Sequence, residues 1–469
     1  MKLQEIIELL NNSPSGDGDK RSIYFIGIGG IGMSNLARYF KNKGAVVSGY
    51  DKTSTVLTKQ LEAEGIKIHY EDNIEFIDKG ASLVVYTPAI PKEHSELKYY
   101  QQQNYNVVKR ADVLGAIINR SFNICVAGTH GKTTTSTMVA HILRDSGFGC
   151  TAFLGGIAAN YNSNFWTSEN NVCVAEADEY DRSFLKLDPN IAIISSMDPD
   201  HLDIYGTEEA MQEAFIDFSK KIKQGGLLIS RYGLKRGNEL SAANQLAYAV
   251  NENAADVYAT NIKMNNGSYR FDVQFKDGMI KDVVLNMGGL HNIENVTAAI
   301  TVASHLKIDE QKIKAAVENF KGVKRRFEYI IAPGEQETVF IDDYAHHPEE
   351  LRALITGAKK LFENKKCTVV FQPHLFSRTR DLADGFAEVL DIADEVLLLP
   401  IYPARELPME GVSSQMILER MKNKNKQLLS KDELKAWVKN NKTELLVTAG
   451  AGDIDVLVQP IKEILTGNK

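Results

Sequence analysis

The stretch that decides the fold is residues 122–134, FNICVAGTHGKTT. An apolar, β-branched run is followed there by a glycine-rich turn and then by residues that open a helical pattern. Strand, glycine turn and helix in this order predict the first part of a βαβ unit, and such units build parallel sheets. The same order recurs at residues 22–34, SIYFIGIGGIGMS, and a third apolar strand opens at residues 338–341. The sequence therefore predicts an α/β protein made of three blocks.

The three blocks predict three domains. Their expected boundaries lie near residues 120 and 330, which gives domains at 1–120, 121–330 and 331–469. A chain of 469 residues has room for about three domains of ordinary size. We expect a Rossmann-like first domain, a central P-loop ATPase-like domain with a mainly parallel sheet, and a Rossmann-like last domain. Within the central domain, residues 257–286 alternate polar and apolar side chains, which predicts an antiparallel extension.

The composition argues against several classes of protein. The net charge is −7 and the pI is near 5.9, whereas a nucleic-acid-binding chain usually carries a basic face. No apolar run approaches the length of a membrane span, and the first residues lack the pattern of a signal peptide. We therefore expect a cytoplasmic protein without nucleic-acid or membrane partners. The four cysteines form no CxxC pair, so we expect buried, reduced thiols.

The first glycine-rich turn, residues 27–32, has the pattern GxGxxG between a strand and a helix. Glycines at these positions let the backbone turn tightly and approach a diphosphate, which the N-terminus of the following helix attracts. Asp51 ends the next expected strand and could accept a hydrogen bond from a ribose hydroxyl. Nicotinamide-nucleotide sites share this pattern, so it does not specify the nucleotide. The candidate ligand-binding residues are Gly27, Gly29, Gly30, Ile31, Gly32 and Asp51.

The second glycine-rich turn, residues 128–134, reads GTHGKTT. It departs from the strict P-loop pattern, because Val126 stands where the first glycine is expected. The chemistry still fits a nucleoside triphosphate. Backbone N–H groups can surround the phosphates, Lys132 can reach the β and γ oxygens, and the Thr133 hydroxyl can ligate Mg²⁺.

Acidic residues follow two expected strands of the central block. The sequence EADE, residues 176–179, comes directly after the strand expected at 172–175, which is where a magnesium-binding carboxylate is expected. The sequence DPDHLD, residues 198–203, follows the strand expected at 191–195 and contains His201. Because ligands of open α/β sheets bind at the carboxyl ends of the strands, both segments point to the ligand crevice.

The third block carries two polar clusters, DDYAHHP at residues 342–348 and QPHLFSRTR at residues 372–380. Each cluster directly follows an expected strand. If those two strands are neighbours, Tyr344, His346 and Arg378 face one crevice. Such a crevice could hold an amino acid, with arginine on the carboxylate and aspartate or histidine near the amine. A zinc site at residues 346–347 is disfavoured, because no third ligand has metal spacing.

The sequence resembles the Mur ligase family, and within it the branch that adds alanine. The resemblance runs through nine motifs in order along nearly the whole chain. They are GIGGIGMS (27–34), GTHGKTT (128–134), EADE (176–179), DHLD (200–203), HNIEN (291–295), GVKRRF (322–327), DDYAHHP (342–348), FQPH (371–374) and GAGD (450–453).

The resemblance implies a role for each domain. The first would bind the diphosphate of UDP-N-acetylmuramate, the central one ATP with Mg²⁺, and the last L-alanine, with the chain a monomer or a homodimer. The implied ATP-binding residues are Gly128, Thr129, His130, Gly131, Lys132, Thr133, Thr134, Asn292, Asn295, Arg325 and Arg326. The implied metal ligands are Thr133, Glu176 and His201. The implied amino-acid-binding residues are Tyr344, His346, Arg378 and Arg380. The implied catalytic residues are Lys132, His201, Arg326, Asp343 and His346.

This sequence departs from the family pattern in two places. Some members carry arginine where Leu375 stands, so one carboxylate contact is absent or is supplied by Arg380. Other Mur ligases use a carbamylated lysine on the helix after DHLD, but residues 208–219 contain no lysine, which fits the alanine-adding branch.

The reaction implied by the resemblance is an ATP-dependent ligation through an acyl phosphate, in the synthesis of cell-wall precursor. Three alternatives remain open at this point. A ligase that attaches a recycled peptide to the same sugar would differ in its amino-acid pocket. A nicotinamide-dependent dehydrogenase would leave the second glycine loop unexplained. A P-loop regulatory switch would leave the polar clusters of the third block unexplained.

Overall fold

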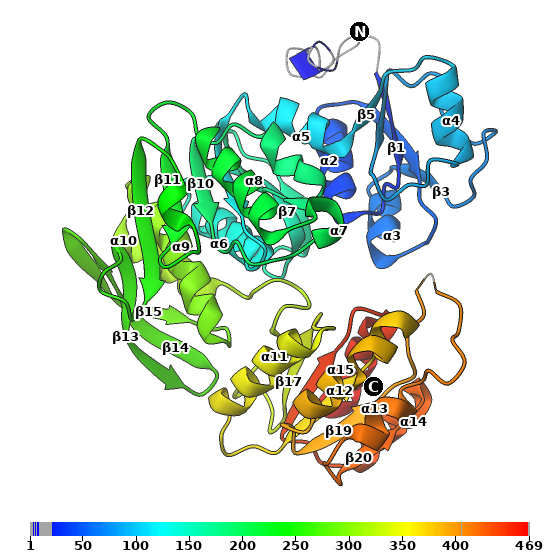
Figure 1. The fold of residues 1–469 in the computed structure, drawn as a ribbon, viewed down its shortest axis with the longest axis vertical. Helices are drawn as coiled ribbons and strands as arrows, with labels where there is room; N and C mark the ends of the chain where they lie inside the picture. Colours follow the sequence, from blue (N-terminus) through cyan, green and yellow to red (C-terminus); the bar gives the residue numbers. More distant parts are fainter. Residues whose placement is uncertain (1–2, 4, 6, 9–20, 405, 468–469) are drawn as a thin grey trace. The chain divides into compact units, whose positions relative to one another are not determined.

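The structure is a computed structural model that describes residues 3, 5, 7–8, 21–404 and 406–467 (Figure 1). The chain forms two compact units. The first contains the chain up to Ile157, Asn162–Tyr258 and Asn295–Ile313; the second contains Ala158–Tyr161, Ala259–Glu294 and the chain from Lys314 onward.

A five-stranded parallel sheet begins the first unit, with the strand order β3-β2-β1-β4-β5. Its strands are β1 (Ser22–Ile26), β2 (Val46–Tyr50), β3 (Lys67–His69), β4 (Leu83–Tyr86) and β5 (Val107–Lys109). The connecting helices are α2 (Ile31–Asn42), α3 (Val56–Ala63), α4 (Ser95–Gln102) and α5 (Arg110–Ile118). The chain leaves β1 toward β2 and later returns to β4 on its other side. The first glycine loop therefore sits at the topological switch point, where α/β sheets bind ligands.

Seven further strands of the first unit lie in the order β12-β11-β10-β6-β9-β7-β8. They are β6 (Phe122–Ala127), β7 (Thr151–Ala158), β8 (Ser163–Trp166), β9 (Val172–Glu176), β10 (Ile191–Ile194), β11 (Leu227–Arg231) and β12 (Asn244–Val250). The pairs β11/β12, β10/β11, β6/β10, β6/β9 and β7/β9 are parallel, as the βαβ pattern predicts. The helical segments are α6 (Lys132–Asp145), η1 (Tyr180–Lys186), α7 (Leu202–Tyr205), α8 (Glu208–Lys220), η2 (Gly237–Glu239), α9 (Leu290–His305) and α10 (Glu310–Asn319). Helices α9 and α10 each belong partly to the second unit.

The two sheets of the first unit share one hydrophobic core. Phe25 of β1 and Phe40 of α2 belong to the same buried cluster as Phe153 of β7 and Phe215 of α8. Helix α2 also bonds directly to the second sheet, because the Asn35 side-chain amide donates to the Leu154 carbonyl at 2.9 Å. Packing through α2 fixes the first glycine loop relative to the second sheet.

The second unit contains an antiparallel segment and a six-stranded sheet. Strands β13 (Val257–Asn265), β14 (Ser268–Phe275) and β15 (Gly278–Leu285) are consecutive in one sheet, and β14 pairs with β15 antiparallel. This confirms the antiparallel extension expected at residues 257–286. The other sheet has the order β16-β17-β21-β18-β19-β20, in which only β16 is antiparallel to its neighbour.

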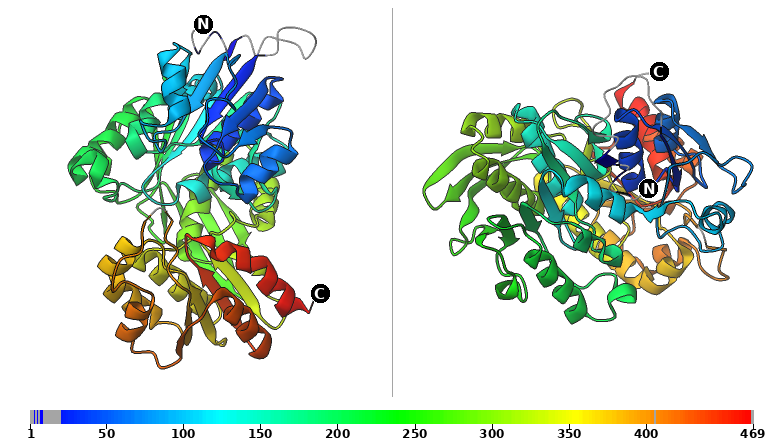
Figure 2. Two further views of the ribbon diagram at one scale, coloured as in Figure 1. Left: turned by 90° about the vertical axis from the view of Figure 1, so that its right-hand side faces the viewer. Right: turned by 90° about the horizontal axis from the view of Figure 1, so that it is seen from above.

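The strands of the six-stranded sheet are β16 (Glu328–Ile331), β17 (Val339–Asp343), β18 (Cys367–Phe371), β19 (Glu395–Leu398), β20 (Lys426–Leu428) and β21 (Leu445–Ala449). Its helices are α11 (Pro348–Leu361), α12 (Phe376–Leu390), α13 (Gln415–Arg420), α14 (Lys431–Asn440) and α15 (Val458–Thr466). They cover both faces of the sheet (Figure 2). The condition that β17 and β18 are neighbours is not met, because β21 pairs with both and lies between them.

The cysteines and the helix lengths bear on two expectations from composition. All four cysteines are buried and free of disulfide bonds, as expected for reduced thiols. Among the residues that the structure describes, none of the helices has the length and apolar character that crossing a bilayer requires.

Candidate active site

The first glycine loop is held by Asp51. The Gly29 amide donates to the Asp51 carboxylate at 2.8 Å, and the Thr53 amide donates to its other oxygen at 3.1 Å. A Cβ atom at Gly29 would stand 2.8 Å from that carboxylate and 2.6 Å from the Thr58 methyl group, so this glycine admits the aspartate. Each carboxylate oxygen has a second lone pair. Asp51 can therefore accept the predicted bond from a ribose hydroxyl in addition to its loop contacts.

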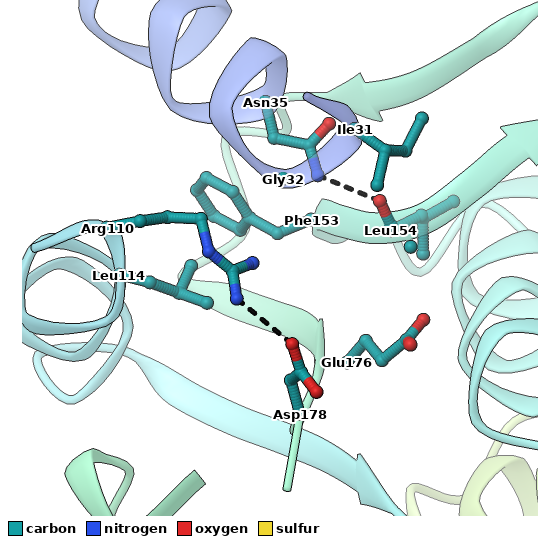
Figure 3. Close-up of a pocket in the computed structure, with 10 residues that line it drawn as sticks. Ile31, Gly32, Asn35, Arg110, Leu114, Phe153, Leu154, Glu176 and Asp178 are labelled. Atoms are coloured by element: carbon teal, nitrogen blue, oxygen red, sulfur yellow. Dashed lines mark hydrogen bonds and ion pairs between the residues drawn. The ribbon is translucent and has the colours of Figure 1, made fainter. Parts of the chain in front are cut away.

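A cavity of about 100 Å³ opens beside this loop (Figure 3). It is lined by Ile31, Gly32, Asn35, Arg110, Leu114, Phe153, Leu154, Gly155, Glu176 and Asp178. The lining comes from α2, α5, β7 and the end of β9, so the cavity joins the first glycine loop to the acidic segment EADE. Arg110 is the one cation among these residues, and it bonds Asp178 at 3.1 Å. No motif in the sequence indicates Arg110.

The second glycine loop is shaped by two serines that follow β10. The Ser196 hydroxyl accepts the His130 amide at 2.7 Å and lies 3.0 Å from the Thr129 hydroxyl. Gly128 has a φ of +141°, and a Cβ atom there would stand 2.2 Å from the Ser195 hydroxyl. These contacts fix the curl of the loop. Nothing in the glycine pattern itself indicates Ser195 or Ser196.

Asn295, an expected ATP-binding residue, also lies against the second loop. Its side-chain oxygen stands 2.8 Å from the position that a Cβ atom of Gly131 would take, and Gly131 itself has a φ of +80°. Asn292, its expected partner in ATP binding, is buried, and its side-chain amide donates to the Gly288 carbonyl.

Lys132 is the first residue of α6 and lies in a buried ion pair. Its ammonium group donates to the Gly128 carbonyl at 2.7 Å and to the Glu179 carboxylate at 2.8 Å. The Glu179 side chain is only 1% exposed. Burial raises the pKa of Glu179, and the charge of Lys132 works in the opposite direction. The predicted phosphate-binding lysine therefore already compensates a buried carboxylate, a contact that the glycine motif does not indicate.

The expected metal ligands fall into two groups. Thr133 lies beside Glu176. Burial raises the pKa of Glu176, and the charge of Lys132 and a hydrogen bond with Thr133 offset part of this rise. The Glu176 Oε2 atom is buried and has no hydrogen-bond partner. An unpaired carboxylate oxygen beside a hydroxyl suits a hard cation such as Mg²⁺.

His201 is placed differently. Its Nε2 atom is 3.8 Å from the Glu179 carboxylate, and its Nδ1 atom is 3.7 Å from the Asp200 carboxylate. Ligand atoms of these three residues all lie within 4.8 Å of one another. His201 therefore lies with Glu179 and Asp200, and Glu179 belongs to the same EADE segment as Glu176.

In the second unit, Asp343 forms hydrogen bonds with two motifs, GVKRRF and DDYAHHP. Its carboxylate accepts the Phe327 amide at 2.6 Å and the Ala345 amide at 2.7 Å. Burial raises the pKa of Asp343, whereas the Phe327 amide and the charge of Arg326 lower it. Asp343 thus joins the end of GVKRRF to the loop after β17, which is a positioning role.

The structure distinguishes the two arginines, Arg325 and Arg326, that are expected to bind ATP. Arg325 lies 3.4 Å from Asp342 and 3.8 Å from Asp455, so its charge is already paired. Within the described part of the chain, Arg326 forms no ion pair; it is exposed and its guanidinium lies 5.8 Å from the Tyr344 ring. Arg326 is therefore the arginine available to a ligand.

A row of rings lies where the amino-acid-binding residues are expected. Ring centroids are 5.3 Å apart for Tyr344 and His346, 6.2 Å for His346 and His374, and 5.8 Å for His374 and Tyr402. Burial lowers the pKa of His346, and the nearby Arg378 lowers it further. The Arg378 Nη1 atom is buried without a hydrogen-bond partner. Although β17 and β18 are not adjacent, the three predicted residues do come together.

Arg380 does not join this group. Its side chain is 54% exposed, and its Nε atom donates to Asp381 at 2.7 Å. Arg378 and Arg380 both lie on α12, where residues two apart point in directions about 200° apart. Only one of the two can therefore face the row of rings.

Comparison with known proteins agrees with these observations. The catalytic domain of the Mur ligase family matches residues 22–122, the Mur ligase middle domain matches residues 126–303, and the glutamate ligase domain matches residues 325–457. A crystal structure of a UDP-N-acetylmuramate-alanine ligase from Thermotoga maritima, 29% identical, superposes with a TM-score of 0.83 and covers 96% of this chain and 100% of that one. A murein peptide ligase from Psychrobacter arcticus, 23% identical, superposes with a TM-score of 0.65 over 95% and 98%, which is a likeness of fold alone.

Two curated relatives cover almost the whole length. A UDP-N-acetylmuramate–L-alanine ligase of Flavobacterium johnsoniae is 48% identical over 452 residues, which are 95% of this chain and 98% of the relative. The enzyme of the same name from Porphyromonas gingivalis is 45% identical over 453 residues, which are 95% and 99% of the two chains. Identity at this level over nearly complete chains, together with three matching domains in order, shows that the chain belongs to the Mur ligase family.

Proposed function

We propose that this chain is an ATP-dependent ligase that joins L-alanine to the lactyl carboxylate of UDP-N-acetylmuramate, in peptidoglycan precursor synthesis in the cytoplasm. The observation that carries the proposal is the 48% identity to a curated ligase of that name over 95% of this chain. The site adds independent support, since this reaction needs a cation for the phosphates, an oxygen ligand for the metal and a cation for the amino-acid carboxylate. Lys132 opens the helix after the second glycine loop, and the Glu176 Oε2 and Arg378 Nη1 atoms are buried without hydrogen-bond partners.

The domain boundaries belong to this proposal. Domains at 1–120, 121–330 and 331–469 are supported by the family matches at 22–122, 126–303 and 325–457. The first would bind the UDP-sugar, the second ATP and the third the amino acid.

In the first step, the sugar carboxylate attacks the γ-phosphorus of ATP, which forms an acyl phosphate and releases ADP. Charge builds up on the bridging and terminal phosphate oxygens during this transfer. Lys132 would leave Glu179 and neutralise the β and γ oxygens, and Arg326 would supply a second positive charge. Thr133 and Glu176 would hold Mg²⁺, which neutralises phosphate charge when bound.

In the second step, the amine of L-alanine attacks the acyl carbon and phosphate leaves. The amine must lose its proton before or during the attack. His346 suits this role because its lowered pKa keeps the imidazole neutral at neutral pH and able to accept a proton. Arg378 would bind the alanine carboxylate through two parallel hydrogen bonds. Asp343 would position Arg326 and Tyr344 through the two backbone amides that it accepts.

A phosphate-release assay tests the proposal. UDP-N-acetylmuramate and ATP are supplied with L-alanine, glycine, L-serine or a cell-wall tripeptide in turn, with and without a chelator. We expect the highest kcat/KM with L-alanine and no release without Mg²⁺. Faster release with the tripeptide would instead support the peptide-attaching ligase, and tight NADH binding would support a dehydrogenase.

A further inference from the structure

A second cavity lies at the other end of the central strands from the glycine loop GTHGKTT. Its volume is about 390 Å³, which falls within the range of roughly 300–1,000 Å³ that small-molecule sites occupy. Ser121, directly before β6, and Cys173, the second residue of β9, line it. GTHGKTT and the acidic segment EADE lie at the carboxyl ends of these two strands. The second cavity is therefore separate from the proposed reaction site, and the reaction does not use it.

Two cations and one acid line the second cavity. Lys43, at the C-terminal end of α2, is exposed and forms no ion pair with any residue that the structure describes. Arg120 bonds Glu8 at 2.6 Å through one Nη atom, which leaves its other N–H groups as donors. This pair is exposed, so an anion could replace Glu8 at small cost. The acid is Glu169, so the lining as a whole favours an anionic ligand.

The second cavity also offers hydroxyl donors. The Thr151 hydroxyl accepts the Ser168 amide at 3.3 Å, and the Ser168 hydroxyl accepts the Asn170 amide at 3.2 Å. A hydroxyl that accepts a backbone N–H keeps its own hydrogen for another acceptor. Within the described part of the chain, neither of these two hydroxyls donates a hydrogen bond to the protein. Two cations and two hydroxyl donors suit a phosphate group, which has three strong acceptor oxygens.

The other lining residues indicate what kind of molecule carries the phosphate. Tyr39 is the one aromatic residue among them; it is 7% exposed, and the Lys43 ammonium lies 5.8 Å from its ring centre. No aromatic face is therefore open to a nucleobase. Glu169 and Asn171 are exposed and carry acceptor oxygens, which suit the hydroxyl groups of a sugar. A sugar phosphate thus fits this lining better than a nucleotide does.

The second cavity shares its walls with the cavity beside the first glycine loop. Helices α2 and α5 and strands β7 and β9 contribute residues to both cavities. Phe153 lines the cavity beside the first loop (Figure 3), and Tyr39 lines the second. The two rings are neighbours, with centroids 5.8 Å apart. Because protein interiors are close-packed, a displacement of one ring is transmitted to the other.

We infer that the second cavity binds a small sugar phosphate, and that its occupant weakens binding in the cavity beside the first glycine loop. The phosphate would contact Lys43 and Arg120. A ligand that presses on Tyr39 moves Phe153 toward the other cavity, which has only about 100 Å³ of space, so we expect a weakening there. The effect on the UDP-sugar rests on the proposed function, whereas the sugar-phosphate site does not.

Calorimetric titration of the full chain tests the site. With ADP and Mg²⁺ present to fill the second glycine loop, the chain is titrated with glucose 1-phosphate, glucose 6-phosphate, inorganic phosphate and AMP. We expect a sugar phosphate to bind more tightly than phosphate or AMP. Lys43→Ala and Arg120→Ala should each weaken it by at least about 10-fold, as for the loss of a charge-assisted contact. Binding of neither sugar phosphate, tighter binding of AMP, or equal binding to wild type and both variants would overturn the inference.

The chain offers a matched control for each cation. Lys41 lies in the last turn of α2 but does not line the cavity, so Lys41→Ala should change nothing. Glu8→Ala breaks the same ion pair as Arg120→Ala but keeps the cation, so sugar-phosphate binding should stay the same or tighten. A control as weak as its partner variant would show a general effect of charge or folding, and the inference would fail. Thr167→Trp, which fills the cavity from an exposed lining position, should abolish binding; full binding would place the ligand elsewhere.

Repeating the sugar-phosphate titration at rising concentrations of UDP-N-acetylmuramate tests the link between the cavities. Coupling between two sites is reciprocal and reaches a limit, typically about 5- to 150-fold, once the second ligand saturates. We therefore expect the affinity for the sugar phosphate to fall to a plateau. A fall without a plateau would show competition for one site, and an unchanged or higher affinity would show no such link; either result would overturn the inference. If UDP-N-acetylmuramate does not bind to the wild type, the proposed function fails instead, and the first titration still decides the site.

Discussion

Replacing Lys132 by methionine should destabilise the protein, and the loss should grow as the pH rises. Methionine keeps most of the length of the side chain but removes the ammonium group that lies 2.8 Å from Glu179. Glu179 is 1% exposed and Lys132 is 14% exposed, so solvent screens the pair little. Removing one partner of a buried ion pair typically costs about 3–5 kcal/mol, because the other charge stays buried and unpaired.

The sign of the pH dependence follows from Glu179. Burial raises its pKa even with Lys132 present, and removing the lysine must raise it further. A carboxyl group whose pKa is higher in the folded state binds its proton more tightly there. Its contribution to stability is then complete below the unfolded pKa and is lost as the pH rises through the folded pKa. Below the folded pKa a protonated Glu179 needs no cation, whereas above the folded pKa the full cost appears. That cost is about 1.4 kcal/mol for each pH unit that separates the folded pKa from the unfolded one.

Urea denaturation at several pH values, followed by circular dichroism, measures this effect. Lys132→Met/Glu179→Gln should regain most of the stability at high pH yet remain inactive, because the phosphates still lack their cation. Lys235→Met is the control, since its pair with Glu208 has the same 2.8 Å separation but Lys235 is 66% exposed. A pH-independent loss in Lys132→Met, or no recovery in the double variant, would refute the reasoning.

Three further predictions concern the other parts of the site. Glu176→Gln should raise the Mg²⁺ concentration needed for half-maximal phosphate release, because a neutral amide replaces a charged ligand; an unchanged requirement would move the metal to the group around His201. Arg378→Lys should raise the KM for L-alanine by about 10- to 150-fold in steady-state kinetics and leave the KM for ATP unchanged, since lysine cannot form the two parallel bonds. Equal effects on all substrates would instead indicate a structural role. Gly29→Ala should weaken UDP binding in a titration by displacing Asp51 from the loop, and full binding would show that this contact is dispensable.

Local patterns in the sequence were sufficient to predict the parallel blocks, because each strand, turn and helix lies within a short stretch of chain. The order of strands is a different kind of information. β17 and β18 follow each other closely in the sequence, yet β21, which begins at Leu445, lies between them in the sheet. Insertion of a distant strand depends on packing across the whole unit, which hydrophobic periodicity does not report.

The candidate site was predicted best where its residues are consecutive. Lys132 and Thr133 belong to one glycine motif, and the structure places Thr133 beside Glu176 as the strand pattern suggests. Ser196 and Arg110 were missed, because a serine after a strand and an arginine at the start of a helix are ordinary features. Their importance appears only through contacts with residues more than 60 positions away, 66 for His130 with Ser196 and 68 for Arg110 with Asp178.

The glycines of the two motifs lie against side chains of the protein itself, and this limits what the motifs predict about ligands. A glycine-rich loop is usually explained by the ligand that approaches its backbone. Here the missing side chain of Gly29 leaves space for the Asp51 carboxylate, that of Gly32 for the Arg110 guanidinium, and that of Gly128 for the Ser195 hydroxyl. A side chain at any of these positions would first displace a group of the protein itself. The motifs therefore indicate phosphate binding, but the partners that make each glycine necessary come from elsewhere in the chain. Substituting a motif glycine therefore first disturbs the contact between the loop and its protein partner. Any effect on ligand binding follows from the loss of that contact.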